Sequence, residues 1–266
     1  MNYEKTIFKK ENGIAIITLN NPDKLNAFSS KMLLELADEL EDVSKDINTK
    51  VLILTGTGDR GFCAGADISA VEGGGTDSDT AEKRGVSPID PIGTELARIR
   101  FLDKPTIAAV NGIAAGGGAA IATACDIRIA SDKARFGAFF VKRSATIHGG
   151  LSYFLPAIVG PAKALELMYT GDIIDAKEGE RIGLFTKVVP HENLMNEAKT
   201  LAKKIASAPP LMLSHTKRQV YSASQNDLKT QLMCEAFALG EISKSEDAKE
   251  GYKAFLEKRE PVYQGK

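Results

Sequence analysis

Apolar and polar residues follow two different periods in the first quarter of the chain, and each period predicts a different element. Gly13–Asn20 alternates as a strand does, and Asn21-Pro22-Asp23 closes it with turn residues. Val51–Thr55 is a continuous apolar run, typical of a buried strand. Between these strands, Ser29–Ile47 predicts a helix, because one face at helical spacing is apolar. That face contains Leu33, Leu36, Ala37, Leu40 and Val43.

The same unit of strand, loop and helix recurs further along the chain. Thr106–Cys125 begins with an apolar run and continues into a Gly/Ala-rich stretch that can form a helix, and Ile127–Ala130 predicts the next strand. Pro91–Phe101 predicts a helix. Alternation of this kind indicates an α/β fold with buried, largely parallel strands.

After Pro190 the pattern is wholly helical, which divides the chain into an α/β core at 1–190 and a helical region at 191–266. A helical region after an α/β core packs either on its own core or on another subunit. The predicted helices are Glu192–Ala206, Leu211–Ala223, Asn226–Ser243 and Asp247–Lys258.

Composition indicates a soluble protein of a reducing compartment. The chain has 266 residues, 43% hydrophobic and 26% charged, with a formal net charge of −1 that gives no reason to expect nucleic acid. Three cysteines without metal-binding spacing favour a reducing environment. The start of the chain lacks the apolar run of a signal peptide, and the Gly/Ala-rich stretch Thr106–Thr123 is too weakly hydrophobic to span a membrane. We therefore expect a cytoplasmic protein without membrane contact.

Two glycine-rich segments, Gly61–Ile68 and Asn111–Gly118, each follow a predicted buried strand and precede a stretch able to start a helix. Turns without bulky side chains leave backbone N–H groups free to point into one cleft, where two donors can hold the charge that develops on a carbonyl oxygen. The pair therefore predicts an oxyanion hole. Tight packing of helix on strand is the structural alternative. Neither segment has the spacing of a dinucleotide- or phosphate-binding loop.

With their order and spacing, these segments resemble the crotonase family, also called the enoyl-CoA hydratase/isomerase superfamily. The resemblance extends from Asn21–Phe28 through Cys125–Ala130 and Gly149–Pro156 to Glu250–Arg259. It implies a spiral of ββα turns followed by a C-terminal helical trimerisation region, assembled as a homotrimer or a dimer of trimers. It also implies an acyl-CoA thioester substrate and an enolate or related oxyanion intermediate, with the substrate's coenzyme A as the only cofactor.

The resemblance also assigns roles to residues. The oxyanion donors would be the backbone N–H groups of Ala66 and Gly117. Coenzyme A would be bound by the first glycine-rich turn, by Lys24 near its phosphates or pantetheine, and by Phe255 and Lys258 from a neighbouring subunit. Each of these assignments has a structural alternative. Lys24 and Lys258 can be solvated surface charges, Phe255 can be a core residue, and Asp67 can cap a helix. The coenzyme-binding residues of the turn are Ala64, Ala66, Asp67 and Ile68.

The chain departs from the hydratases of that family at the two glutamates that hold the added water. Their positions are occupied by Ala120 and Phe140, neither of which accepts a proton or orients water. The branch resembling ring-1,2-epoxyphenylacetyl-CoA isomerase also lacks the pair and uses an acidic residue in a following loop, where this chain has His148. An imidazole can remove and return a proton near neutral pH. The alternative is that His148 only makes a loop hydrogen bond or is exposed.

The sequence therefore predicts double-bond or ring isomerisation of an enoyl-CoA through an enolate, with His148 as proton shuttle. Hydration by a non-standard water site is the first alternative. Decarboxylation, thioester hydrolysis and non-catalytic binding of a CoA ester are further ones. Val71–Val86 is rich in Gly, Ser and Asp and predicts a surface loop, which in an enzyme can act as a lid.

Overall fold

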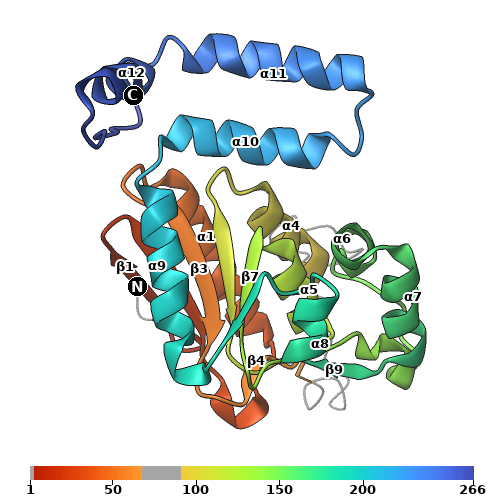
Figure 1. Cartoon of the computed structure of the whole chain (residues 1–266). Coiled ribbons are helices and arrows are strands. Elements are labelled where there is room, and N and C mark those ends of the chain that lie inside the picture. Colours follow the sequence, from red (N-terminus) through yellow and green to blue (C-terminus); the bar gives the residue numbers. More distant parts are fainter. Residues whose placement is uncertain (1–2, 68–90) are drawn as a thin grey trace.

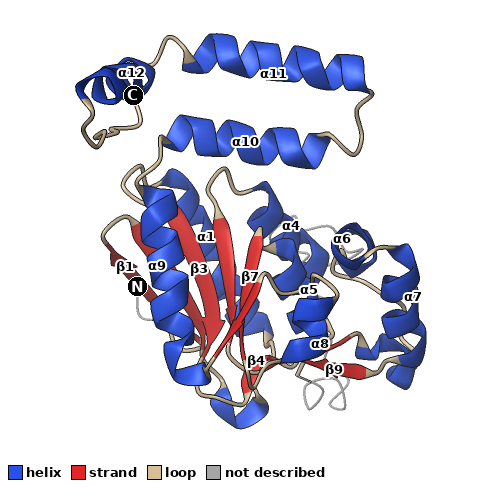
Figure 2. Ribbon diagram, in the orientation of Figure 1, coloured by secondary structure: helices blue, strands red, loops and turns tan. Residues whose placement is uncertain are grey.

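The structure is a computed structural model, and it describes residues 3–67 and 91–266 (Figures 1 and 2). Ile68 and the predicted loop at Val71–Val86 lie outside these residues. The described strands are β1 Thr6–Glu11, β2 Ile14–Leu19, β3 Val51–Gly56, β4 Gly61–Cys63, β5 Thr106–Val110, β6 Ile113–Ala115, β7 Ile127–Ser131, β8 Arg135–Gly137, β9 Ile173–Asp175 and β10 Lys187–Val189.

These strands form two sheets. The larger has the order β1-β2-β3-β5-β7-β10, in which only the β1–β2 pair is antiparallel. The smaller has the order β4-β6-β8-β9, with β9 antiparallel to β8. In sequence, β3, β5 and β7 of the larger sheet are each followed directly by β4, β6 and β8 of the smaller one. The predicted spiral of ββα turns with largely parallel strands is confirmed.

Helices cover both faces of the larger sheet and continue beyond it (Figure 1). The described α-helices are α1 Ser30–Lys45, α4 Pro91–Phe101, α5 Gly117–Ala124, α6 Leu151–Val159, α7 Pro161–Thr170, α8 Ala176–Arg181, α9 Leu194–Ala206, α10 Pro210–Ser222, α11 Leu228–Ile242 and α12 Glu246–Glu257. The short 3₁₀ helices are η1 Pro22–Lys24, η2 Phe139–Arg143 and η3 His191–Asn193.

Alternate residues of β3 enter two different cores, because successive side chains of a strand point to opposite faces. Leu52 and Leu54 pack with the apolar stripe of α1 and with α4. Val51 and Ile53 pack with α9 on the opposite face. This burial on both faces explains why the sequence of β3 is continuously apolar rather than alternating.

The C-terminal helices divide into one that packs on the sheet and three that leave it. α9 comes after residue 190, the predicted domain boundary, yet Ala198 and Ala202 of this helix are buried against the larger sheet. α10, α11 and α12 form an arm beyond the sheet (Figure 1). The boundary itself stays a prediction. Among the described residues, no helix combines the length and apolar character needed to cross a lipid bilayer.

Several short strands differ from the sequence prediction. β4 and β6 lie inside the two segments that we predicted as glycine-rich turns. Each of these three-residue strands contains one residue type that favours strands, Phe62 in β4 and Ile113 in β6, which is too little local signal to predict a strand. Pairing between turns of the spiral forms them.

Glu39 of α1 is a fully buried acid that opposes folding when it is ionised. Its Oε1 accepts a hydrogen bond from the Thr6 hydroxyl (2.6 Å), whereas Oε2 has no partner within the described residues. Burial, assisted by the negative charge of Glu35, raises the pKa of Glu39 to about 7. In the unfolded chain the same carboxyl ionises near pH 4.5. The folded state therefore loses stability as pH rises from 4.5, and the loss is complete above pH 7.

Glu39→Gln is expected to raise the free energy of unfolding at pH 8 by up to about 3 kcal/mol, because the neutral amide does not ionise. At pH 4.5 the gain should largely vanish. Urea unfolding at the two pH values measures the difference, with Glu41→Gln on the exposed face of α1 as control. An equal change at both pH values would mean that Glu39 does not titrate as its burial implies.

Candidate active site

The two glycine-rich turns lie against each other, as the sequence predicted. Gly65 has φ +93°, and a Cβ added there would lie 3.0 Å from Ala115 O and 3.2 Å from Gly117 N. A Cβ on Gly118 would lie 1.9 Å from Cys63 O. A Cβ at Gly118 would overlap Cys63 O, and at Gly65 the positive φ together with a tight contact disfavours any side chain, so glycine suits both positions. The packing alternative is therefore confirmed for these glycines, and the oxyanion hole stays a prediction.

The backbone around Ala66 and Gly117 leaves two amide groups unpaired. On either side of Ala66, Gly65 O accepts from Phe28 N (2.7 Å) and Asp67 N donates to Phe28 O (2.9 Å). Gly117 is the first residue of α5, where an N–H has no partner within the helix. Within the described part of the chain, neither Ala66 N–H nor Gly117 N–H donates to another protein group. Two neighbouring N–H groups are therefore available to an oxyanion.

The electrostatics of this position favour negative charge. All eight residues of α5 are buried, and its N-terminus carries the positive end of the helix dipole. Cys63, which stands beside the turn, is fully buried, and burial raises the pKa of its thiol to about 12. The thiol is therefore protonated at neutral pH, as expected for a packing residue.

Both positions that the resemblance matches to the hydratase glutamates are apolar and buried. Ala120 is 0% exposed in the first turn of α5, and Phe140 is 6% exposed in η2. Phe140 follows Gly137 by three residues, and Gly137 O accepts the N–H of Gly116 (3.1 Å). This hydrogen bond ties the segment of Phe140 to the second glycine-rich turn.

His148 packs directly on Phe140. Their ring centroids are 4.7 Å apart at an interplanar angle of 77°, an edge-to-face contact. Nδ1 of His148 lies 3.1 Å from Thr146 O, and a carbonyl accepts only, so Nδ1 carries the hydrogen. In the neutral ring, Nε2 is then a proton acceptor. No described residue is hydrogen-bonded to Nε2.

The loop hydrogen bond predicted as the alternative role of His148 is therefore present, but it uses one ring nitrogen and orients the other. Sequence reasoning missed Thr146 as the residue that fixes the ring. The only available signal was its spacing of two residues, which suits a local bond from side chain to backbone.

Lys24 and Asp67, both predicted to bind coenzyme A, meet in the structure. Lys24 Nζ lies 2.6 Å from Asp67 Oδ2, with the lysine side chain 48% exposed and the aspartate side chain 15% exposed. Ala64 N donates to Leu25 O (3.0 Å), which joins the first turn to the segment that follows η1. The helix that Asp67 was predicted to cap lies outside the described residues.

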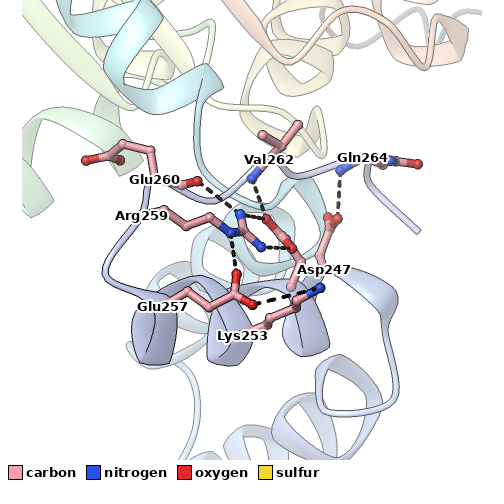
Figure 3. Close-up of polar contacts among 8 residues, drawn as sticks. Asp247, Lys253, Glu257, Arg259, Glu260, Val262 and Gln264 are labelled. Atoms are coloured by element: carbon pink, nitrogen blue, oxygen red, sulfur yellow. Dashed lines mark hydrogen bonds and ion pairs between the residues drawn. The ribbon is translucent and has the colours of Figure 1, made fainter.

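Phe255 lies in α12 and Lys258 is the residue that caps the end of this helix, which belongs to the arm beyond the sheet (Figure 1). Phe255 is 81% exposed, so the alternative that it belongs to the core is wrong. Ion pairs of Arg259 with Glu250 (2.6 Å) and Glu257 (2.7 Å) hold the chain beyond α12 against that helix (Figure 3). Both predicted residues are therefore presented outward on an ordered surface.

Comparisons with known proteins agree with this geometry. The sequence model described as enoyl-CoA hydratase/isomerase matches residues 9–266. The chain is 40% identical over 260 residues to a crotonyl-CoA hydratase from Syntrophomonas wolfei, covering 97% of this chain and 97% of the relative. It is 36% identical over 260 residues to 1,2-epoxyphenylacetyl-CoA isomerase from Escherichia coli, covering 96% and 97%.

A solved structure gives the same assignment. The crystal structure of an enoyl-CoA hydratase from Bacillus anthracis matches with a TM-score of 0.93 at 34% identity, covering 99% of this chain and 100% of that one. The match spans the spiral and the C-terminal helices together. The chain therefore belongs to the enoyl-CoA hydratase/isomerase family, the crotonase superfamily, and is an enzyme of that type.

Proposed function

We propose that this enzyme isomerises an enoyl-CoA thioester through an enolate, with His148 moving the proton. The observation that carries the proposal is the state of the His148 ring, whose Nδ1 is fixed on Thr146 O while no described residue bonds to Nε2. Such an imidazole can accept a proton from one carbon and return it to another. The relative from Escherichia coli, whose name is that of an isomerase, supports this choice.

In the proposed reaction, Nε2 removes a proton from the acyl chain, and the electron pair of the broken C–H bond moves to the thioester oxygen. The N–H groups of Ala66 and Gly117 stabilise the resulting oxyanion. The imidazolium then returns its proton to a different carbon, and the carbonyl re-forms. No atom is gained or lost, so the reaction needs no cofactor beyond the coenzyme A of the substrate.

The apolar pair at Ala120 and Phe140 supports isomerisation over hydration. Addition of water needs groups that hold a water molecule and exchange its proton, and a methyl group and a phenyl ring do neither. The same residues lower the polarity beside the oxyanion donors, which strengthens the interaction of the two N–H groups with charge.

Hydration is the second candidate, and a specific finding favours it. Relatives that are 40% identical carry the names crotonyl-CoA hydratase and short-chain-enoyl-CoA hydratase. In this chain a hydrating water would have to be held by groups other than residues 120 and 140. Among the described residues, Nε2 of His148, whose ring packs on Phe140, is a hydrogen-bond acceptor that can hold such a water.

We also propose that the chain assembles as a homotrimer or a dimer of trimers through its arm. α11 buries only Ala238 among its described residues and exposes large apolar side chains, as expected for a helix that another subunit covers. In such an assembly, Phe255 and Lys258 would reach the coenzyme A of a neighbour. The exposed apolar residues of α11 include Leu228, Leu232, Met233, Phe237 and Leu239.

The reaction class is tested by incubating linear and cyclic 2-enoyl- and 3-enoyl-CoA thioesters with the enzyme in deuterated water and weighing the products by mass spectrometry. The proposal expects deuterium at carbon without the mass of an added water. A product that has gained a whole water would identify hydration instead. Release of carbon dioxide or free coenzyme A would indicate decarboxylation or hydrolysis.

His148→Gln is expected to lower the rate of deuterium exchange at carbon by about 10²–10⁴-fold, because an amide cannot accept the proton. Affinity for a saturated acyl-CoA, measured by calorimetry, should stay within a factor of about two, because only the proton acceptor is lost. His191→Gln, in η3, serves as the control histidine. Exchange at the unaltered rate in His148→Gln would remove His148 from the mechanism while leaving the wild-type product analysis valid.

Gly65→Ala is expected to reduce turnover by about 10²-fold or more, because its Cβ would press the two turns apart and displace an oxyanion donor. Gly58→Ala is the matched control, since Gly58 has φ +81° but an added Cβ there meets nothing within 4 Å. Both positions have a positive φ that strains an alanine, so the ratio of the two turnover numbers reports mainly the effect of the close backbone contact at Gly65. Equal losses in the two variants would contradict this reading.

A further inference from the structure

A partly buried polar cluster lies at the carboxyl end of α5, opposite the end that carries Gly117. Asp126, two residues beyond α5, accepts hydrogen bonds at Oδ2 from Thr106 N (2.7 Å) and at Oδ1 from the hydroxyl of Tyr221 (2.6 Å). Lys217 Nζ, on a side chain that is 8% exposed, lies 3.0 Å from Asp126 Oδ2. Lys217 and Tyr221 both belong to α10, so this cluster anchors the arm to the core.

Arg100, near the end of α4, contacts three other helices: α10, through Tyr221 of this cluster, and also α5 and α6. Its guanidinium carbon lies 3.9 Å from the ring centroid of Tyr221 in α10 and 4.5 Å from that of Phe154 in α6. Its Nη2 donates to Thr123 O in the last turn of α5 (3.2 Å). The flat guanidinium thus contacts two aromatic rings and a helix terminus together, which a lysine side chain cannot do.

Two of these helices begin at the candidate active site. α5 starts with Gly117, and α6 starts at Leu151, three residues after His148. Phe154, in the first turn of α6, lies so close to Gly150 that a Cβ added to Gly150 would be 2.7 Å from its ring. Arg100 therefore contacts both the helix that presents an oxyanion donor and the residue that packs on the loop of His148.

The position of α5 depends strongly on its ends. The helix has eight residues, mostly glycine and alanine, so its side chains interlock little with its neighbours. Its last carbonyls need partners, and cations at a helix C-terminus are favourable. Thr123 O has Arg100, and Cys125 O accepts from Arg128 Nη1 (2.7 Å).

We propose that Arg100 is a positioning residue that aligns α5 and α6 with the docked arm, and so sets the Gly117 N–H and His148 for catalysis. The proposal rests on the oxyanion and proton-shuttle roles given above. Arg100 itself touches neither Gly117 nor His148 among the contacts described. Its effect would pass through Thr123 at one end of α5 and through Phe154 beside the His148 loop.

The test compares Arg100→Met with Arg218→Met in the full-length protein. Arg218 of α10 also links arm and core, through an exposed pair with Asp103 (Nε to Oδ1, 2.9 Å), but contacts neither α5 nor α6 in the structure. Arg100→Met is expected to lower kcat about tenfold with KM within about twofold, because donors are displaced while the substrate site persists. Amide hydrogen exchange across residues 117–124 should rise about tenfold. Arg218→Met should leave all three quantities near the wild-type values.

Arg100→Lys keeps the charge without the planar face and is expected to fall between wild type and Arg100→Met. If Arg100→Met does not fold, Arg100→Lys takes its place in the comparison with Arg218→Met. Unchanged exchange across 117–124 in the Arg100 variants, or an equal rise in Arg218→Met, would overturn the proposal. Because amide exchange is read without substrate, it decides the role of Arg100 even if the wild-type enzyme catalyses no isomerisation. Failure of the wild-type enzyme to isomerise any substrate would refute the proposed function without deciding the role of Arg100.

Discussion

The structure depends on the contact between two backbones at the glycine-rich turns. Gly118 admits Cys63 O to a distance at which no side chain fits, and Gly65, with φ +93°, lies close to Ala115 O and Gly117 N. Through this contact, successive turns of the spiral lie close enough for β4 and β6 to pair. The same approach leaves the N–H groups of Ala66 and Gly117 without protein acceptors among the described residues. Packing and chemistry therefore impose the same requirement on these glycines.

The chemistry at this contact is set by what surrounds the two donors. Carboxylates at positions 120 and 140 would be charged groups that hold water. Ala120 and Phe140 instead leave a buried, apolar boundary. Phe140 also provides the surface on which the His148 ring rests. In the proposed mechanism, the apolar ring at position 140 and the imidazole that would transfer the proton are thus joined by one aromatic contact.

Much of the fold followed from local pattern, because α1, β3 and β5 bury continuous faces and their periodicity records that burial. The four helices after Pro190 were predicted to within two residues at each end from their helical pattern, and in the structure Asp227 and Ser245 cap two of them. β4 and β6 were not found, because pairing between distant segments forms them. Arg100 was missed for the same reason: its partners Phe154 and Tyr221 are far away in sequence, and an arginine on a helix gives no sign of burial by itself.

For the site, the sequence predicted the two turns and His148, and the structure adds the contacts that hold each of them in place. Thr146 fixes the imidazole from within its own loop, whereas α5 is fixed at its far end by groups from α4 and α10. Small side chains on a short helix make few interlocking contacts with neighbouring elements. Hydrogen bonds at its end therefore help to fix the position of α5, a role that side-chain packing has in larger helices. α10 is also the first helix of the arm, and Lys217 and Tyr221 of this helix bind Asp126, two residues beyond α5. Assembly and catalysis in this enzyme would then be linked through one buried cluster rather than through the surface of α11 alone.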